Sequence, residues 1–469
     1  VMGSYDELGR REELVEDTNE FGEAVVRIDH DPTPFLRFEF HRIDQRVRQR
    51  LSGGGRMEYV LALGLDRAGF SDVRVNEWRV APRIDARLPL GKFLGPGQDL
   101  ELGLGIDQEI QIFRLPNGLA GESLGASLED LALLLAERVV SVTGLYADLA
   151  YRRGRFEARP GLRVDTWVQF GASPYLPQAR TVSSATGVDP RLLLREQVGE
   201  RWVLRQSLGL YHQPPDPPLP IPGLESIGLE TGLQRNIQGS FGWEWTIADR
   251  ATLTQDAYLG RLSNMQDYEL TQGIDSVGAG SGDEFDDALI RVSGWAWGLE
   301  TMLRLNPDGR IYGWLAYTLS WSFRDYPLGG WAPATWDQRH ILNAVVGWAI
   351  NPKWRLGGRL HVNSGRPYTA RRMVDGELES LATAIVDHRN DARLPPFMQL
   401  DLRVERIFTL REFRLHLYLD LANANFAREV LQCDSLAQTN DLTVEVIDGC
   451  VNPQAIRYVL PALGLRAVF

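Results

Sequence analysis

Hydrophobic and polar residues alternate one by one along most of this chain. The clearest stretch is 396–425, where most alternate residues are apolar and the residues between are mostly acidic or basic. Successive side chains of a β-strand point to opposite faces, so the stretch predicts a hairpin with one apolar and one charged face. Such strands, about ten residues per crossing, are typical of a transmembrane barrel with hydrocarbon outside and water inside.

The same period of two recurs from residue 22 to the C-terminus. We therefore expect an all-β, antiparallel barrel over 22–469, preceded by an irregular acidic segment at 1–21. A short helix beginning near Ser127 is expected to interrupt the strands. The pattern predicts about 18 strands, at 22–28, 35–50, 56–66, 73–88, 99–107, 140–151, 156–170, 191–196, 202–212, 233–247, 251–262, 290–305, 310–324, 340–350, 354–362, 398–408, 413–421 and 458–469.

The predicted connections alternate between short and long over the C-terminal two thirds. Segments such as 248–250 and 351–353 are tight, whereas the connections at 171–178, 213–231, 265–288, 325–337, 365–396 and 426–456 are longer. Bacterial outer-membrane barrels have short periplasmic turns and long external loops. The asymmetry therefore predicts an integral outer-membrane protein, with its short turns in the periplasm and its long loops outside the cell.

Composition narrows the function classes. Apolar residues make up 44% of the 469 residues, and no run of about 18 consecutive apolar residues exists, which argues against a membrane-spanning helix. The net charge of -12 argues against nucleic acid as a partner. The 13 Trp, 14 Tyr and 17 Phe suit aromatic girdles at the membrane interfaces, and no cofactor motif is present.

Several short stretches between about residue 140 and the C-terminus carry a family resemblance through their order and spacing. They are 160–165 (PGLRVD), 190–191 (PR), 297–304 (WGLETMLR), 312–320 (YGWLAYTLS), 337–343 (DQRHILN), 364–369 (SGRPYT), 399–404 (QLDLRV), 418–423 (YLDLAN) and the terminal Phe469. From about residue 140 to the end, the chain thus resembles the barrel of TonB-dependent outer-membrane receptors, in the style found among myxobacteria. The resemblance implies energy-coupled uptake of a scarce nutrient such as a metal chelate, vitamin, glycan or peptide. It also implies contact with outer-membrane lipid and lipopolysaccharide, and recognition of Phe469 by the barrel-assembly machinery.

Two features depart from that family. Its members have 22 strands and an N-terminal plug domain, and neither the extra strands nor a plug is visible in this sequence. Either a plug and further strands precede Val1, in which case the TonB system is an expected partner, or the barrel is plugless. A plugless barrel would instead be a structural anchor or scaffold subunit of a larger outer-membrane complex.

Charged residues on the predicted inner face are the candidate site residues. They could bind a plug, a solute or one another, and mutual pairing is the simplest interpretation. The set comprises Arg359, His361, Asp401, Arg403, Glu405, Arg414, His416 and Asp420.

The two cysteines, Cys433 and Cys450, lie close together in one irregular segment. They suggest a disulfide formed in an oxidising compartment, although two unrelated thiols would give the same sequence. An acidic loop, 282–287, has four carboxylates from Asp283 to Asp287 that could bind calcium, but it lacks the spacing of a defined calcium loop. A solvated loop is the simpler interpretation.

A catalytic function is not expected. His361 and Ser364 superficially resemble the His and Ser of an outer-membrane phospholipase. Their spacing, however, places His361 on the inner face and Ser364 at the end of the strand, so a base beside the nucleophile is not predicted.

Overall fold

One large antiparallel sheet dominates the computed structural model of the chain. The structure describes residues 2–8, 13–18, 24–29, 36–70, 73–91, 95, 97–114, 138–173, 176–215, 229–268, 289–306, 309–370, 373–374, 377–378, 381–434, 446–447 and 450–468. Within them the main sheet contains 19 strands, of which β16 (Gly330–Pro333) has only four residues. The predicted all-β fold with about 18 strands is confirmed.

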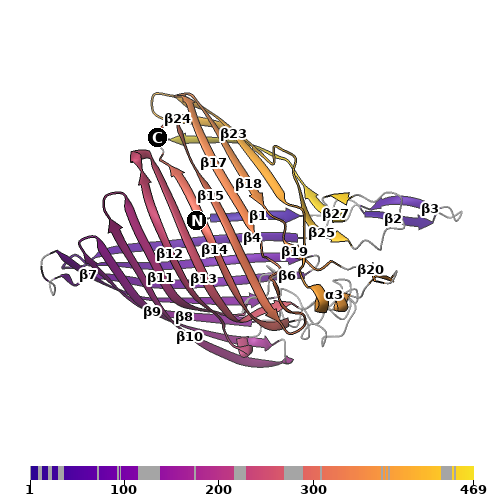
Figure 1. Ribbon diagram of the computed structural model, residues 1–469, viewed down its shortest axis with the longest axis horizontal. Coiled ribbons are helices and arrows are strands. Elements are labelled where there is room, and N and C mark those ends of the chain that lie inside the picture. Colours follow the sequence, from indigo (N-terminus) through magenta and orange to yellow (C-terminus); the bar gives the residue numbers. More distant parts are fainter. Residues whose placement is uncertain are drawn as a thin grey trace.

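The strands of the main sheet pair almost entirely with their neighbours along the chain. The N-terminal half contains β1 (Met2–Leu8), β4 (Leu36–Arg50), β5 (Arg56–Phe70), β6 (Val73–Pro89), β7 (Gln98–Arg114), β8 (Arg138–Arg153), β9 (Phe156–Ser173), β10 (Leu176–Val198) and β11 (Trp202–Gln213). The rest contains β12 (Gln234–Ile247), β13 (Ala251–Tyr268), β14 (Leu289–Leu305), β15 (Ile311–Tyr326), β16, β17 (His340–Asn351), β18 (Trp354–Asn363), β23 (Phe397–Thr409), β24 (Arg414–Ala422) and β28 (Leu460–Val468). Figure 1 shows this sheet curled into a barrel, with the strands of the second half crossing in front of those of the first.

The series of paired strands has two borders. At one, β1 pairs with residues 36–42 of β4; at the other, β28 pairs with β24. Among the described residues no register joins β28 to β1 or β4. Figure 1 likewise places β28 and β1 apart. The outward edges of β28 and of residues 43–50 of β4 are therefore the borders of the sheet.

The two ends of the barrel differ as the sequence predicts. At the end we call the turn end, connections such as those between β8 and β9 and between β10 and β11 are tight. Gly154 and Gly199 lie in these two turns with φ of +58° and +71°, a conformation that costs glycine little. The opposite end, called the loop end, has the longer connections and most of the small extra elements (Figure 1).

Small elements lie outside the main sheet. They are the paired strands β2 (Glu13–Thr18) and β3 (Ala24–Asp29), β19 (Pro367–Tyr368) with β22 (Ala392–Arg393), and β20 (Met373–Val374) with β21 (Glu377–Leu378). β25 (Arg428–Asp434), β26 (Val446–Ile447) and β27 (Cys450–Arg457) form a three-stranded sheet, and the helices are η2 (Leu229–Thr231), η3 (Ala248–Arg250) and α3 (Leu381–His388). No helix within the described ranges is long and apolar enough to span a membrane.

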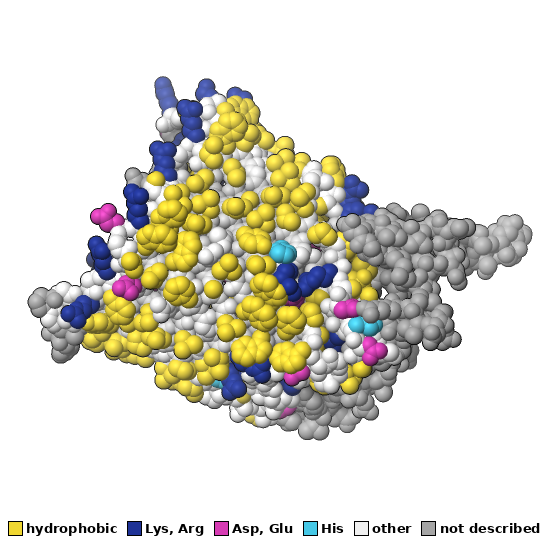
Figure 2. Space-filling model, in the orientation of Figure 1, with side chains coloured by type: hydrophobic (Ala, Val, Ile, Leu, Met, Phe, Trp, Pro, Cys, Tyr) yellow, Lys and Arg dark blue, Asp and Glu magenta, His cyan; other side chains and the backbone are white. Residues whose placement is uncertain are grey.

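Many of the side chains exposed on the barrel wall are hydrophobic. Leu104, Leu145, Leu208 and Leu259 are between 40% and 57% exposed, a pattern opposite to that of a water-soluble core. Figure 2 shows hydrophobic side chains spread over the visible outer face, with Lys and Arg gathered along its turn-end border. We call the side with these apolar residues the outer face, and the opposite side the inner face.

Several expectations need correction. Residues 2–8 and 13–18, predicted to be irregular, form β1 and β2, because backbone pairing at a sheet edge does not require an apolar face. The strand predicted at 22–28 pairs with β2 rather than with the barrel wall. Strands β9 and β10 continue through most of the loop predicted at 171–178. Strand β13 continues past residue 262 because a bulge absorbs an extra residue at Asn264, with φ of +54°.

Candidate functional site: the charged inner wall and the loop-end cluster

Cross-strand ion pairs line the inner face of the first half of the barrel. The Arg163 guanidinium donates from Nη2 to Asp107 at 2.7 Å and to Asp165 at 2.6 Å, which joins β7 to β9 across β8. Nearer the turn end, Asp148 accepts hydrogen bonds of 2.7 Å from both Arg87 and Arg159. These pairs form because the alternation places the partners on one face of the sheet, on the same strand, on adjoining strands or one strand apart.

The network continues across the next strands. Asp189, only 2% exposed, lies 2.7 Å from Nδ1 of His212, and Asp256 accepts a hydrogen bond of 2.7 Å from Arg205. The inner wall is therefore a nearly continuous belt of paired charges rather than a single pocket. Buried carboxylates are favourable only when paired in this way.

Most of the inner-face residues predicted from the sequence contact one another. His416 Nδ1 lies 2.7 Å from Oε1 of Glu405, and both residues are less than 9% exposed. Arg403 Nη1 lies 3.3 Å from Oδ2 of Asp420, and its guanidinium stacks on Tyr418 with 3.9 Å to the ring centroid. In the register of β23 and β24, Arg403 lies directly opposite Asp420, whereas Glu405 and His416 are diagonal neighbours.

The remaining predicted residues have looser contacts. Arg359 lies 3.8 Å from Asp401, and Arg414 is exposed at the turn end of β24. Whether any of these side chains binds a solute stays a prediction.

His361 is not paired with Ser364. Its ring nitrogens lie 2.7 Å from Asn343 and 3.1 Å from Asn363, whereas the Ser364 hydroxyl accepts a hydrogen bond from the backbone N–H of His340. A serine nucleophile needs a base within hydrogen-bond reach, so this geometry gives no catalytic pair.

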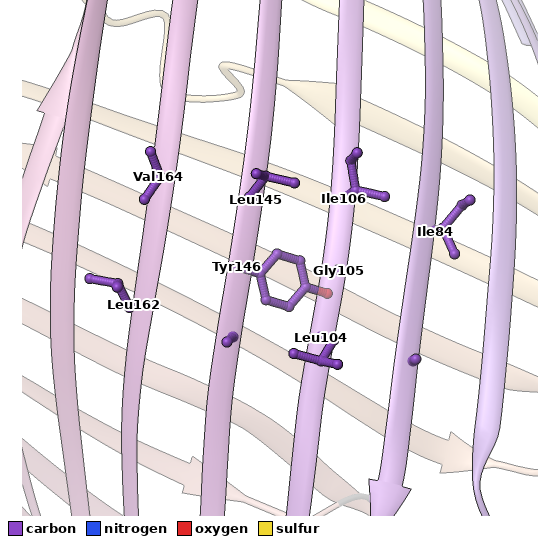
Figure 3. Close-up of a pocket in the computed structure, with 10 residues that line it drawn as sticks. Ile84, Leu104, Gly105, Ile106, Leu145, Tyr146, Leu162 and Val164 are labelled. Atoms are coloured by element: carbon purple, nitrogen blue, oxygen red, sulfur yellow. The ribbon is translucent and has the colours of Figure 1, made fainter.

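Tyrosines cover glycines on the inner face. A Cβ added at Gly105 would lie 2.3 Å from the ring of Tyr146, which is directly opposite on β8 (Figure 3). Because glycine has no side chain, the ring can lie flat against the neighbouring strand. The same arrangement occurs at Gly298 with Tyr258, Gly347 with Tyr312 and Gly464 with Tyr418.

An apolar hollow of about 540 Å³ lies on the outer face over β6 to β9 (Figure 3). Ile84, Leu104, Leu145 and Leu162 line it, each 40% exposed or more. Its lining carries no charged side chain.

A buried carboxylate organises the loop end of β15 and β17. Asp337 is 2% exposed and accepts hydrogen bonds from Nη2 of Arg393 at 2.5 Å and of Arg339 at 3.3 Å. Its other oxygen accepts from the backbone N–H of Ser322 at 2.8 Å. Because Arg393 belongs to the 364–396 connection, Asp337 ties that connection to the wall. We call Asp337, Arg339 and Arg393 the loop-end cluster.

A polar pocket of about 480 Å³ opens beside the bulge in β13. Asn264, Arg291, Ser293 and Asp325 supply its polar lining. In the sequence these residues show no common motif; they adjoin only because the bulge and the ends of β14 and β15 meet there.

Sequence reasoning placed Asp337 within a family-like stretch but did not single it out. In the sequence Asp337 is a lone acidic residue at the start of 337–343. Its partner Arg393 is 56 residues away, so only the fold brings the two together. Cys433 is disulfide-bonded, and Cys450 is the chain's only other cysteine. The acidic loop 282–287, the helix predicted near Ser127 and Phe469 lie outside the described residues.

No family model matches the sequence, and no curated protein matches it. Solved structures do match its fold. They include the closed form of the ferric-catecholate import receptor Fiu from E. coli K12, with a TM-score of 0.62 and 10% identity over 92% of this chain and 64% of that one. The unliganded ferric citrate transporter FecA matches with a TM-score of 0.61 and 14% identity over 93% and 63%. The ferric yersiniabactin uptake receptor FyuA from Yersinia pestis matches with a TM-score of 0.54 and 14% identity over 94% and 63%.

These structures define the class of fold. The chain has the β-barrel fold of TonB-dependent outer-membrane receptors, as the sequence resemblance predicts. It spans less than two thirds of the length of each of the three solved chains.

Proposed function

We propose that this chain is the barrel of an outer-membrane receptor that takes up a scarce nutrient by energy-coupled transport. The observation that carries the proposal is the combination of an apolar outer face with a belt of paired charges inside. An apolar wall suits hydrocarbon, and the polar interior suits water, a solute or a plug.

The ion-paired inner wall is compatible with a plug that moves during transport. Barrels of 16 to 18 strands enclose an aqueous channel, and still larger ones hold a plug in the lumen. Charges such as Arg163 and Asp148 are already neutralised by neighbours on the wall. A plug could therefore leave or rearrange without exposing unpaired buried charge.

Isolation of the native complex from outer membranes tests this function. We expect the full polypeptide to contain or to retain a plug domain. We also expect a deletion strain to accumulate less of at least one probe among ferric citrate, a ferric catecholate, haem, copper and cobalamin. A protonophore should remove the difference between the wild type and the deletion strain. A barrel that instead co-purifies in fixed ratio with other outer-membrane subunits, with no plug and no uptake difference, would establish the scaffold function.

A further inference from the structure

Two arginines lie on the outer face among aromatic rings, one near each end of the barrel. Arg261 of β13 pairs in register with Trp295 of β14, and its guanidinium carbon lies 4.9 Å from the Trp295 ring centroid and 6.0 Å from that of Trp331. Trp295 and Trp331 are 38% and 52% exposed, and Arg261 is half-buried. The register thus places a cation inside an exposed aromatic cluster at the loop end.

The turn end has the same arrangement. Arg406 of β23 lies opposite Trp354, with 5.0 Å between its guanidinium carbon and the Trp354 ring centroid, and 5.0 Å to that of Phe408. Phe408 is 38% exposed. Both arginines alternate with apolar outer-face residues, Leu259 and Val404.

Within the part of the chain that the structure describes, no carboxylate lies within salt-bridge distance of Arg261 or Arg406, whereas inner-face arginines such as Arg87 and Arg163 are paired. Aromatic rings orient a guanidinium and shield its flat faces, but they leave its N–H edge unpaired. The edge can donate two parallel hydrogen bonds to an oxyanion.

We propose that Arg261 and Arg406 are binding sites for lipid phosphate. Arg261 lies at the loop-end border of the apolar outer face, and Arg406 lies at its turn-end border. The ligand follows from position and chemistry. At the boundary between hydrocarbon and water the abundant oxyanions are the phosphates of lipid headgroups, and guanidinium groups pair with phosphate bidentately. Aromatic rings at that level fix the depth of the barrel in the membrane. The inference rests on the proposed membrane placement of the chain.

Native mass spectrometry of the full polypeptide, purified from outer membranes and delipidated, tests the loop-end site. The probes are diphosphoryl lipid A, phosphatidylglycerol, phosphatidylcholine and inorganic phosphate. Arg261→Gln is expected to weaken binding of the anionic lipids about tenfold, the loss of roughly one charge-assisted contact. Arg235→Gln is the matched control, because Arg235 is an exposed arginine on the adjacent strand β12 with no aromatic contact among the described residues. Its expected change is less than twofold.

The probes separate the possible sources of phosphate. Selective loss of lipid A binding would place Arg261 in the outer leaflet, and equal loss for lipid A and phosphatidylglycerol would indicate a general lipid-phosphate site. Binding of inorganic phosphate alone, or equal losses in Arg261→Gln and Arg235→Gln, would overturn the proposal. Heat-modifiable migration of the variants on gels verifies that the barrel is folded. An unfolded or non-membrane wild type would instead contradict the proposed function.

Arg406→Gln gives an independent test at the turn end. Phosphatidylglycerol binding is expected to fall about tenfold, with lipid A binding unchanged, if Arg406 faces the periplasmic leaflet. Unchanged binding of phosphatidylglycerol would remove the turn-end site from the proposal.

Discussion

At the scale of single residues, the loop-end cluster depends on one acid. Asp337 is buried and holds two guanidinium groups and a backbone N–H. Removing one partner of a buried ion pair is far more costly than removing an exposed charge, because the other partner stays buried without compensation.

We therefore expect Asp337→Ala to cost about 3–5 kcal/mol locally and to release the 364–396 connection from the wall. Limited proteolysis of folded protein should then cut this connection several times faster than in the wild type. Asp325→Ala, which removes an exposed carboxylate from the end of β15, is the control and should change the rate little. Equal cleavage in both variants would show that Asp337 does not hold the connection.

Gly105 is a second residue with a specific requirement. Gly105→Val should destabilise the barrel by about 1–3 kcal/mol, because the new side chain overlaps the Tyr146 ring. Adding Tyr146→Ala should recover part of the loss, as measured by the temperature at which gel migration changes. Gly239→Ala is the control, since an added Cβ there meets nothing closer than 3.7 Å. No recovery in the double variant would contradict the ring contact.

At the scale of elements, the alternation predicted the strands well and their ends poorly. The outward residues of β15 could be identified from the sequence because each strand has one apolar and one polar face. The bulge at Asn264 and the extension of β9 and β10 could not, since backbone pairing continues there without an apolar pattern. The sequence identified His416 and Glu405 as inner-face residues of one hairpin but not as a pair, and the contact of Asp337 with Arg393 required the whole fold.

Strand β15 offers a direct test of the two faces. Leu315→Arg should destabilise the barrel by about 2–4 kcal/mol in lipid vesicles, because the charge enters the apolar belt. Thr318→Arg should be tolerated, since residue 318 points inward beside Glu300. Urea unfolding in vesicles measures both variants. Equal losses would contradict the assignment of outer and inner faces.

At the scale of the whole molecule, the border strand β28 is more exposed than most of the wall, whereas the border residues of β4 are as exposed as the wall. Leu463 and Leu465 of β28 are 74% and 66% exposed, and Ile43 and Val47 of β4 are 53% and 50% exposed. A sheet edge in hydrocarbon leaves backbone N–H and C=O groups without partners, at a cost of several kcal/mol for each group.

Hydrogen exchange should detect these borders. In the 469-residue chain held in detergent, the amides of β28 that point away from β24 should exchange at least about tenfold faster than those of β17, which is paired on both sides. In native outer membranes the same amides should be protected. Equal protection of β28 and β17 in detergent would mean that the borders already have partners.

The separation of those borders along the chain has a consequence for assembly. Most registered pairings of the main sheet join strands that are consecutive along the chain, so each hairpin can form as soon as its two strands meet. β4 and β28 come instead from opposite ends of the chain. Bringing them together, directly or through intervening strands, closes a loop of about 400 residues. Closing so long a loop costs conformational entropy, so contacts of this kind form slowly. We therefore expect closure of the barrel to be the last and rate-limiting step of its assembly.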